Sequence, residues 1–225
     1  MSYILSFDTA TKNCSVSLSK SGVLIALKEL NSGDYSHAEK LHVFIEDVLR
    51  EAQIEFSDLS AVCVGKGPGS YTGLRIGVSA AKGICFALDI PLIAVQSLEV
   101  LASSVSIDTG VIIPMLDARR LEVFSAVFDA QGKNIRKTEA QIIDPTSFVE
   151  YLEQGPVYFV GDGVEKCKEI ILHKNAIFID AHFPSAKEMV LLADKKFKAK
   201  EFEDVAYFEP FYLKDFIGIK PKPRK

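Results

Sequence analysis

The chain has 225 residues, of which 48% are hydrophobic and 25% are charged, and its formal net charge is −4. This balance argues against a disordered chain and against a protein that by itself binds nucleic acid over a broad surface. No stretch approaches the roughly 18 uncharged apolar residues of a membrane span, so we expect no contact with a membrane, and we expect no signal peptide.

The first hundred residues predict three strands followed by alternating helices and strands. Tyr3–Leu30 contains a strand that ends at Asp8, a polar turn, a second strand, a glycine turn and a third strand. Ser36–Ala52 carries apolar residues on one broad helical face, and Ser36 and Glu39 have the spacing of a capping box. The predicted elements that follow are a strand at Ala61–Val64, a helix at Thr72–Leu88 and a strand at Leu92–Val95.

A glycine-rich turn links the predicted strand at Ala61–Val64 to the predicted helix at Thr72–Leu88. It reads GKGPGSYTGLRIG from Gly65 to Gly77. Its glycines allow close backbone approach, and the unpaired N–H groups at a helix start favour an anion. The spacing matches neither GxxxxGK[ST] nor GxGxxG, so the turn alone does not identify a nucleotide site. We expect Ser70 to cap the helix.

The second half repeats the layout of the first. Val111–Ala140 again holds a strand, an aspartate, a turn and two further strands, and Asp117 precedes Gly132 by 15 residues where Asp8 precedes Gly22 by 14. The elements expected after it are a helix at Pro145–Glu153, a strand at Val157–Val160, a helix at Val164–Leu172 and a strand at Ala176–Ile179. The duplication predicts two similar α/β lobes, at residues 1–100 and 101–225, with a cleft between them.

The cysteines and histidines do not predict a metal site. The cysteines are widely spaced and form no CxxC pair: Cys14, Cys63, Cys85 and Cys167. We expect them to be reduced core residues of a cytoplasmic protein. The histidines are His37, His42, His173 and His182. The first two are separated by roughly 140° around a helix, which prevents them from sharing one ion, and HExxH is absent.

A phosphate site in the first lobe would use the turn after Asp8, with Ser15 close behind. The candidate vestigial phosphate-binding residues are Asp8, Thr9, Thr11, Gly67, Gly69 and Ser70. The matching turn of the second lobe reads Asp117-Ala118-Arg119-Arg120 and offers neither glycine nor hydroxyl, and Gly161-Asp162-Gly163 adds a carboxylate. We therefore expect no tight ATP binding by the chain alone. The plain alternatives are an Asp8 bonded to turn amides, and arginines that form salt bridges between the lobes.

The helix at Thr72–Leu88 carries two apolar stripes where a surface helix packed on one side would carry one. Two stripes predict burial on two sides, one against the sheet and one against a partner. The predicted partner interface consists of residues from this helix and from Ser36–Ala52: Leu41, Phe44, Ile45, Val48, Gly73, Leu74, Gly77, Val78, Ala81, Ile84 and Cys85. The alternative is that the two helices bury each other within one lobe.

Several segments together resemble one family. Two strand–Asp–turn–strand hairpins are typical of the superfamily of actin, sugar kinases and Hsp70 ATPases. Within it, GPGSYTGLRIG closely resembles the signature of the TsaB (YeaZ-like) family. SFDTATKNCSVSL, MLDARRLEVFSAVF and PFYLKDF also resemble it, although Lys214 stands where the family more often has arginine. The matches run from Ile4 to Phe216.

The resemblance implies an α/β fold of two duplicated actin/RNase H-like lobes, each a mixed sheet flanked by helices. It implies a cytoplasmic, non-catalytic subunit in the synthesis of threonylcarbamoyladenosine in tRNA. Its partners would be the catalytic paralogue TsaD, bound through the first lobe, and the ATPase TsaE, with a homodimer when alone. ATP or ADP would bind weakly or at the partner interface, and tRNA indirectly or weakly, for example through the basic tail at Ile217–Lys225.

Two other functions stay open from the residues. The first alternative is an ATP-dependent enzyme of the same superfamily with its own nucleotide site. The second is a metalloprotease, which the absence of a zinc-binding histidine pair argues against. We expect no catalytic residue, because Cys14 and Ser15 have no histidine close to them in the sequence and no GxSxG is present.

Overall fold

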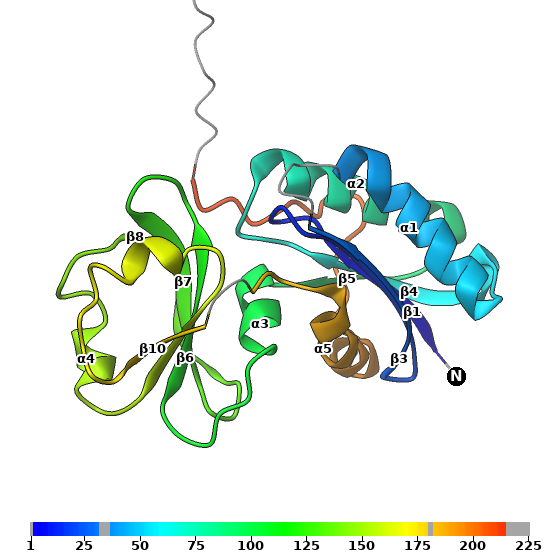
Figure 1. The fold of residues 1–225 in the computed structure, drawn as a ribbon. Coiled ribbons are helices and arrows are strands. Elements are labelled where there is room, and N and C mark those ends of the chain that lie inside the picture. The colour runs from blue at the N-terminus through cyan, green and yellow to red at the C-terminus, as the bar shows by residue number, and fades with distance from the viewer. Residues whose placement is uncertain (1, 32–36, 180–181, 215–225) are drawn as a thin grey trace, which may run out of the picture.

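The computed structural model describes residues 2–31, 37–179 and 182–214, and these form two lobes built on one sheet each (Figure 1). The first sheet has the order β3-β2-β1-β4-β5, and the second has the order β10-β9-β6-β7-β8. The first-lobe strands are β1 (Tyr3–Asp8), β2 (Cys14–Lys20), β3 (Val23–Leu30), β4 (Leu59–Gly65) and β5 (Leu92–Val95). The second-lobe strands are β6 (Val111–Asp117), β7 (Glu122–Asp129), β8 (Asn134–Ile142), β9 (Val157–Val160) and β10 (Ala176–Ile179).

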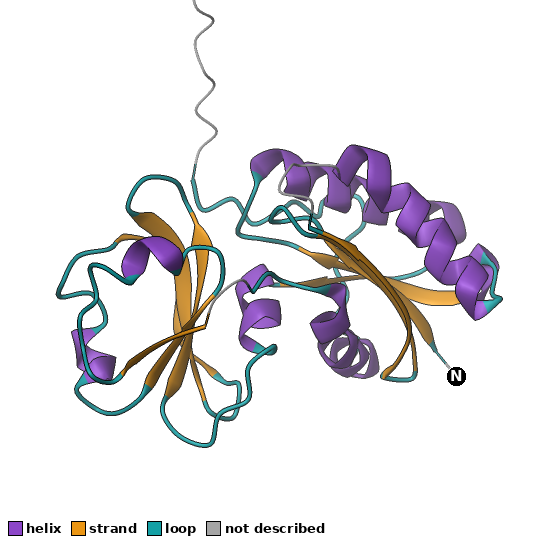
Figure 2. Ribbon diagram, viewed as in Figure 1, coloured by secondary structure: helices purple, strands orange, loops and turns teal. Residues whose placement is uncertain are grey.

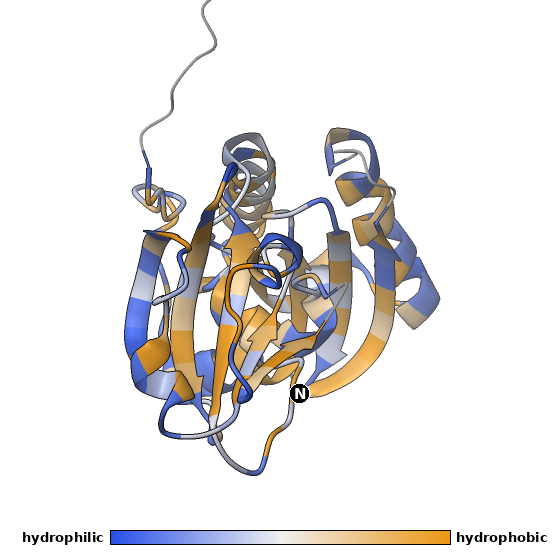
Figure 3. Ribbon diagram, turned by 60° about the vertical axis from the view of Figure 1, so that its left-hand side comes forward, coloured by the Kyte–Doolittle hydropathy of each residue, from blue (hydrophilic) through white to orange (hydrophobic). Residues whose placement is uncertain are grey.

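Both sheets are mixed, and their strand orders are equivalent. In each lobe the first strand pairs antiparallel with the second and parallel with the fourth. The central strands read as continuous apolar runs, as expected for strands covered on both faces. Figure 3 shows this apolar character along the central strands. The predicted duplication is confirmed at the level of strand order.

Helices lie on both faces of the first sheet (Figure 2). The helices that the structure describes in the two lobes are α1 (His37–Ala52), α2 (Tyr71–Leu88), α3 (Ser97–Ala102), α4 (Val149–Leu152) and α5 (Ala186–Ala199), with short 3-10 turns η1 (Phe56–Asp58) and η2 (Glu165–Cys167). α1 packs on β2 and β3, and α2 packs on β4. α5 packs on the opposite face, against β1, β2 and β5. The predicted capping box at Ser36 lies outside the described residues.

The second lobe has shorter helical segments than predicted. The helix expected at Pro145–Glu153 is only α4, because Asp144 Oδ1 accepts hydrogen bonds from the amide and hydroxyl of Thr146 and holds a turn there. Phe148 then adopts a left-handed φ of 65° before the helix begins. The helix expected at Val164–Leu172 is the 3-10 turn η2 followed by further turns. Both length predictions are therefore wrong.

Two helices that the sequence analysis did not predict cross between the halves of the chain. α3 comes from the first half, yet its Leu98 and Leu101 pack with Ile112 and Phe124 of the second sheet. α5 comes from the second half, yet its buried Met189 packs in the cluster that covers the outer face of the first sheet. The boundary at residue 100 stays a prediction, and each half supplies a helix to the other half's sheet.

The start of α5 is tied to β2 by hydrogen bonds. Ser17 Oγ donates to Ala186 O at 2.7 Å, and Ala186 N donates to Ser15 Oγ at 2.8 Å. Asn13 Nδ2 donates to Pro184 O at 3.1 Å. These buried polar side chains of β2 face α5, which explains why serines alternate along an otherwise apolar strand.

The chain after α5 forms a strap, Phe202–Lys214, across the first lobe. Glu203 N donates to Leu92 O at 2.8 Å, and Phe211 N donates to Lys66 O at 2.8 Å. Phe208 is buried in the core of the first lobe, and Leu213 packs in the cluster of the second. The strap therefore covers the edge strand β5 and ends on the second lobe.

All four cysteines are free and buried, as predicted. Burial raises the pKa of the Cys14, Cys85 and Cys167 thiols to about 11 and raises that of Cys63 further. They pack as small apolar side chains. Among the described helices, none combines the length and the apolar character that crossing a bilayer requires.

Two glycines of α2 provide a matched test of its packing. A Cβ on Gly77 would lie 2.4 Å from Thr9 Oγ1, whereas a Cβ on Gly83 would meet nothing within 4 Å. We expect Gly77→Ala to lower the free energy of unfolding by about 1–3 kcal/mol through overpacking. Gly83→Ala should raise it by about 0.8–1 kcal/mol through helix propensity. Urea unfolding measures both, and equal effects of the two substitutions would contradict the packing.

Candidate functional site

The turn between β1 and β2 lies directly on the N-terminus of α2. Ser70 N donates to Ala10 O at 2.7 Å, and Thr9 Oγ1 donates to Gly73 O at 2.7 Å. Ser70 Oγ accepts from Gly73 N at 3.3 Å, which confirms the predicted cap. The amide of Ser70, which an anion at this helix start would use, thus has a carbonyl of the protein as its acceptor.

The glycines of the turn are required by this close contact. A Cβ on Gly69 would lie 2.3 Å from Ala10 O, and a Cβ on Gly73 would lie 2.1 Å from Thr9 O. Gly67 has φ of 101°, a region that favours glycine, and the following X-Pro peptide bond is cis. The glycine-rich motif therefore lets one backbone segment pack on another.

Asp8 is fully buried beneath this contact. Its Oδ1 accepts from Ala10 N at 2.8 Å, and its Oδ2 accepts from Ser97 Oγ at 2.8 Å. A Cβ on Gly65 would lie 1.9 Å from Oδ2, so only glycine fits there. Burial raises the pKa of Asp8, and the two hydrogen bonds oppose this shift. Asp8 therefore accepts a hydrogen bond from an amide of the turn, as the alternative to a phosphate site predicted.

The six candidate phosphate-binding residues are thus brought together, but into a closed contact. Asp8, Thr9 and Thr11 are buried, and the side chain of His37 closes the turn from the other side, with Nε2 2.7 Å from Thr11 O. Burial lowers the pKa of His37. The phosphate-binding role of these residues stays a prediction. A phosphate could reach them only if the β1–β2 turn moved away from α2.

The equivalent turn of the second lobe is exposed. Lys166 pairs with Asp117, and Lys214 at the end of the strap pairs with Glu122. Asp117 N donates to Asp162 Oδ1 at 3.0 Å, and burial raises the pKa of Asp162. Arg119 and Arg120 form no ion pair with the residues that the structure describes, so the predicted inter-lobe salt bridges are wrong for this part of the chain.

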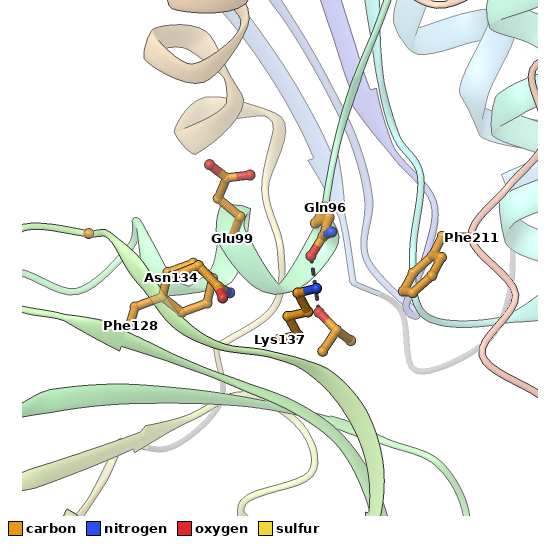
Figure 4. A pocket seen from close by; sticks show the side chains of 8 residues that line it. Gln96, Glu99, Phe128, Asn134, Lys137 and Phe211 are labelled. Atoms are coloured by element: carbon orange, nitrogen blue, oxygen red, sulfur yellow. Dashed lines mark hydrogen bonds between the residues drawn. The ribbon is translucent and has the colours of Figure 1, made fainter.

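A cavity of about 360 Å³ lies where β8 faces the start of α3 and the strap (Figure 4). Across it, Thr138 Oγ1 donates to Gln96 Oε1 at 3.0 Å and joins the two lobes. The other lining residues are Glu99, Phe128, Gly132, Asn134, Lys137 and Phe211. Its size is within the range of small-molecule sites. The sequence analysis did not find these residues, apart from Phe211 in the PFYLKDF motif.

No group of three or more metal-ligating side chains occurs among residues 2–31, 37–179 and 182–214. The two histidines of α1 point to different surroundings, since His37 is buried and His42 is exposed. His173 Nδ1 accepts from Asn175 N at 3.2 Å. His37 and His173 thus make local structural contacts.

Most of the predicted partner interface is buried within the first lobe. The residues with at most 4% exposure are Leu41, Ile45, Val48, Leu74, Val78, Ala81 and Cys85. Gly73 and Gly77 are buried against Thr9. These nine residues are not available to a partner in this structure, because the sheet, α1 and the β1–β2 turn already cover them. Phe44 and Ile84 are only partly buried.

The outward face of α2 is nevertheless apolar. Phe86 is 84% exposed, Gly83 and Ala87 are exposed, and Ile76 and Ala80 are only partly buried. These residues lie within one broad sector of a helix of 3.6 residues per turn. Val43 of the neighbouring α1 is 47% exposed. The surface that a partner could cover therefore lies beside the buried stripe.

The buried Asp8 predicts a pH dependence of stability. Burial raises the pKa of Asp8 in the folded chain. The unfolded chain therefore releases the Asp8 proton at a lower pH than the folded chain does. The contribution of Asp8 to stability therefore decreases from low to neutral pH. We expect the difference in unfolding free energy between Asp8→Asn and wild type to shift in favour of the variant as the pH rises. A difference that is constant with pH in denaturant titrations would contradict this.

The chain is similar to known proteins over almost its entire length. A family model described as "TsaD: tRNA N6-adenosine threonylcarbamoyltransferase" matches residues 33–218. The tRNA threonylcarbamoyladenosine biosynthesis protein TsaB of Escherichia coli K12 is 29% identical over 99% of both chains. The TsaB of Bacillus subtilis 168 is 32% identical over 94% of this chain and 93% of that protein.

The solved structures agree with the sequence relatives. YeaZ from Pseudomonas aeruginosa is 26% identical and covers 95% of this chain and 100% of its own, with a TM-score of 0.80. This match and the two equivalent sheets confirm the predicted class of two duplicated actin-like lobes. The chain therefore belongs to the TsaB (YeaZ-like) family, within the wider group that the TsaD model matches.

Proposed function

We propose that this protein is a non-catalytic subunit of the machinery that makes threonylcarbamoyladenosine in tRNA. The observation that carries the proposal is the similarity, over 94–99% of the chain, to proteins named for the biosynthesis of this nucleoside. The protein acts in the cytoplasm beside a catalytic paralogue of the TsaD type and an ATPase of the TsaE type.

The geometry of the first lobe supports a non-catalytic role. Catalysis of phosphoryl transfer in a two-lobed fold needs free backbone amides and an accessible carboxylate at the cleft. Here the carbonyl of Ala10 accepts from Ser70 N, and Asp8 is completely buried. The second turn presents arginines rather than small residues. ATP or ADP therefore binds weakly, or only at a surface that a partner completes.

The outward face of α2 is the surface that we assign to the paralogue. It combines exposed small residues, which permit close approach of another helix, with the exposed ring of Phe86. Aromatic side chains, phenylalanine included, are enriched at the cores of protein–protein interfaces. In the absence of the paralogue, the same face pairs two copies of this chain.

Reconstitution tests the proposal directly. The purified paralogue and ATPase are incubated with ATP, an activated threonylcarbamoyl donor and unmodified tRNA, with and without this chain, and the modified nucleoside is quantified. We expect formation to depend on this chain. Equal yield without it would overturn the proposal, and so would rapid ATP turnover by this chain alone, which is the result that the alternative ATP-dependent enzyme predicts.

Substitutions on the outward face of α2 test the partner surface. We expect Phe86→Glu and Ala87→Glu to weaken binding to the paralogue by about tenfold or more, since a buried unpaired carboxylate is strongly unfavourable. Both positions are exposed, so the folded state should persist.

Leu172→Glu is the matched control, because Leu172 is 82% exposed on the second lobe. Size-exclusion chromatography and calorimetry with the paralogue measure the effect. If Phe86→Glu and Ala87→Glu bind the paralogue as tightly as the control and wild type do, the assigned surface is wrong.

A further inference from the structure

The turn between β6 and β7 holds two arginines in a strained conformation. Arg119 and Arg120 have φ of 71° and 53°, in the left-handed region that a residue with a Cβ rarely adopts. Glycine or asparagine is the usual occupant of such positions. The turn is nevertheless closed by hydrogen bonds, since Ala118 N donates to Glu122 O at 3.1 Å and Glu122 N donates to Arg119 O at 3.2 Å.

Two acidic side chains at this turn pair with lysines, and a third, Asp162, is mostly buried and accepts a hydrogen bond from Asp117 N. Lys166 pairs with Asp117 and also donates to the carbonyl of Glu122, and Lys214 pairs with the carboxylate of Glu122. Arg119 and Arg120 are both exposed and lack an ion pair within the described chain. The turn thus presents two uncompensated guanidiniums on a protein whose net charge is −4.

The equivalent turn of the first lobe shows that the fold does not require this arrangement. There Thr9, Thr11 and Asn13 are buried, and only Lys12 of residues 9–13 is exposed. In the second lobe, two adjacent arginines are exposed instead. Local folding therefore explains neither the strained backbone nor the choice of arginine, and strain of this kind is typical of residues kept for function.

We propose that Arg119 and Arg120 bind neighbouring phosphates of an RNA backbone. A guanidinium donates two parallel hydrogen bonds to a phosphate and stays charged at every relevant pH. The arginines line neither the cavity beside Gln96 nor the groove between α2 and the strap. A protruding turn without a pocket suits an extended polyanion better than a small anion. The inference rests on the proposed function, which brings a tRNA to the assembly.

The first experiment measures the affinity of the full chain for an unmodified tRNA transcript between about 50 and 200 mM KCl. The test variant is R119N/R120G, which removes both charges and relieves the backbone. We expect its affinity to fall by about tenfold or more, and the slope of log affinity against log salt to decrease by about 1.4–1.8. Its melting temperature should be no lower than that of wild type, which separates this effect from unfolding.

Two control variants isolate the contact. K133Q/K195Q removes the same charge from two exposed positions outside the turn and should leave the salt slope unchanged. R119K/R120K keeps the charge but loses the paired donors of the guanidinium, so it should keep the salt slope of wild type and lose part of the affinity. Equal losses in R119N/R120G and K133Q/K195Q would indicate only a general charge effect and would overturn the inference.

The second experiment uses the reconstituted assembly with the paralogue. We expect R119N/R120G to raise KM for tRNA about tenfold at unchanged kcat, with unchanged binding to the paralogue. If wild type and variant share the same KM and tRNA affinity, the inference fails while the proposed function stands. If the variant instead loses a protein partner, the turn binds an acidic protein surface and the inference is likewise wrong. Loss of all activity without this chain tests only the proposed function.

Discussion

The contact between the β1–β2 turn and the start of α2 determines the character of the first lobe. The carbonyls of Thr9 and Ala10 lie against two glycines of the motif that opens the helix, Gly73 and Gly69. The Ser70 amide donates to Ala10 O and the Gly73 amide donates to Ser70 Oγ, so these two amides of the helix start have acceptors within the chain. The same contact buries Asp8, places Ser97 beside it and so fixes the position of α3. A sequence typical of phosphate recognition here builds a rigid corner.

The two lobes are joined by exchanged elements rather than by a simple linker. α3 leaves the first sheet and packs on the second, while α5 and the strap return from the second half to cover the first. The Thr138–Gln96 hydrogen bond and the Lys214–Glu122 ion pair add polar connections. α5 lies on the opposite face of the sheet, and the strap runs along one side of α2, where Lys82 Nζ donates to Phe208 O at 2.9 Å and Tyr71 contacts Tyr212. Phe86 and Ala87 stay exposed beside the strap. The surface proposed for a partner is thus distinct from the inter-lobe contacts.

The sequence predicted the strands well and the contacts of the helices poorly. Alternation and apolar runs located the ten strands, and the duplication predicted two similar lobes, because these signals are local and repeat. α3 and α5 were missed, and each follows the fifth strand of its half, where the predicted pattern ends. The two stripes of α2 were assigned to a partner, yet residues such as Val78 are covered by the chain itself. Hydrophobicity alone does not say which neighbour buries a side chain. Likewise, the motif around Gly69 could not reveal that Ala10 O would approach it.

The late position of α5 in the chain has a consequence for synthesis on the ribosome. The outer face of the first sheet, including Ile4, Ala61 and Ile93, is covered by side chains of α5 such as Met189. While the nascent polypeptide still lacks those residues, this face has no intramolecular cover, although all five of its strands have already been made. The amino-terminal lobe therefore cannot mature first, as domains made in order generally do, and completes its core only near the end of translation. Nascent chains of this protein should hence expose an apolar sheet to chaperones until release.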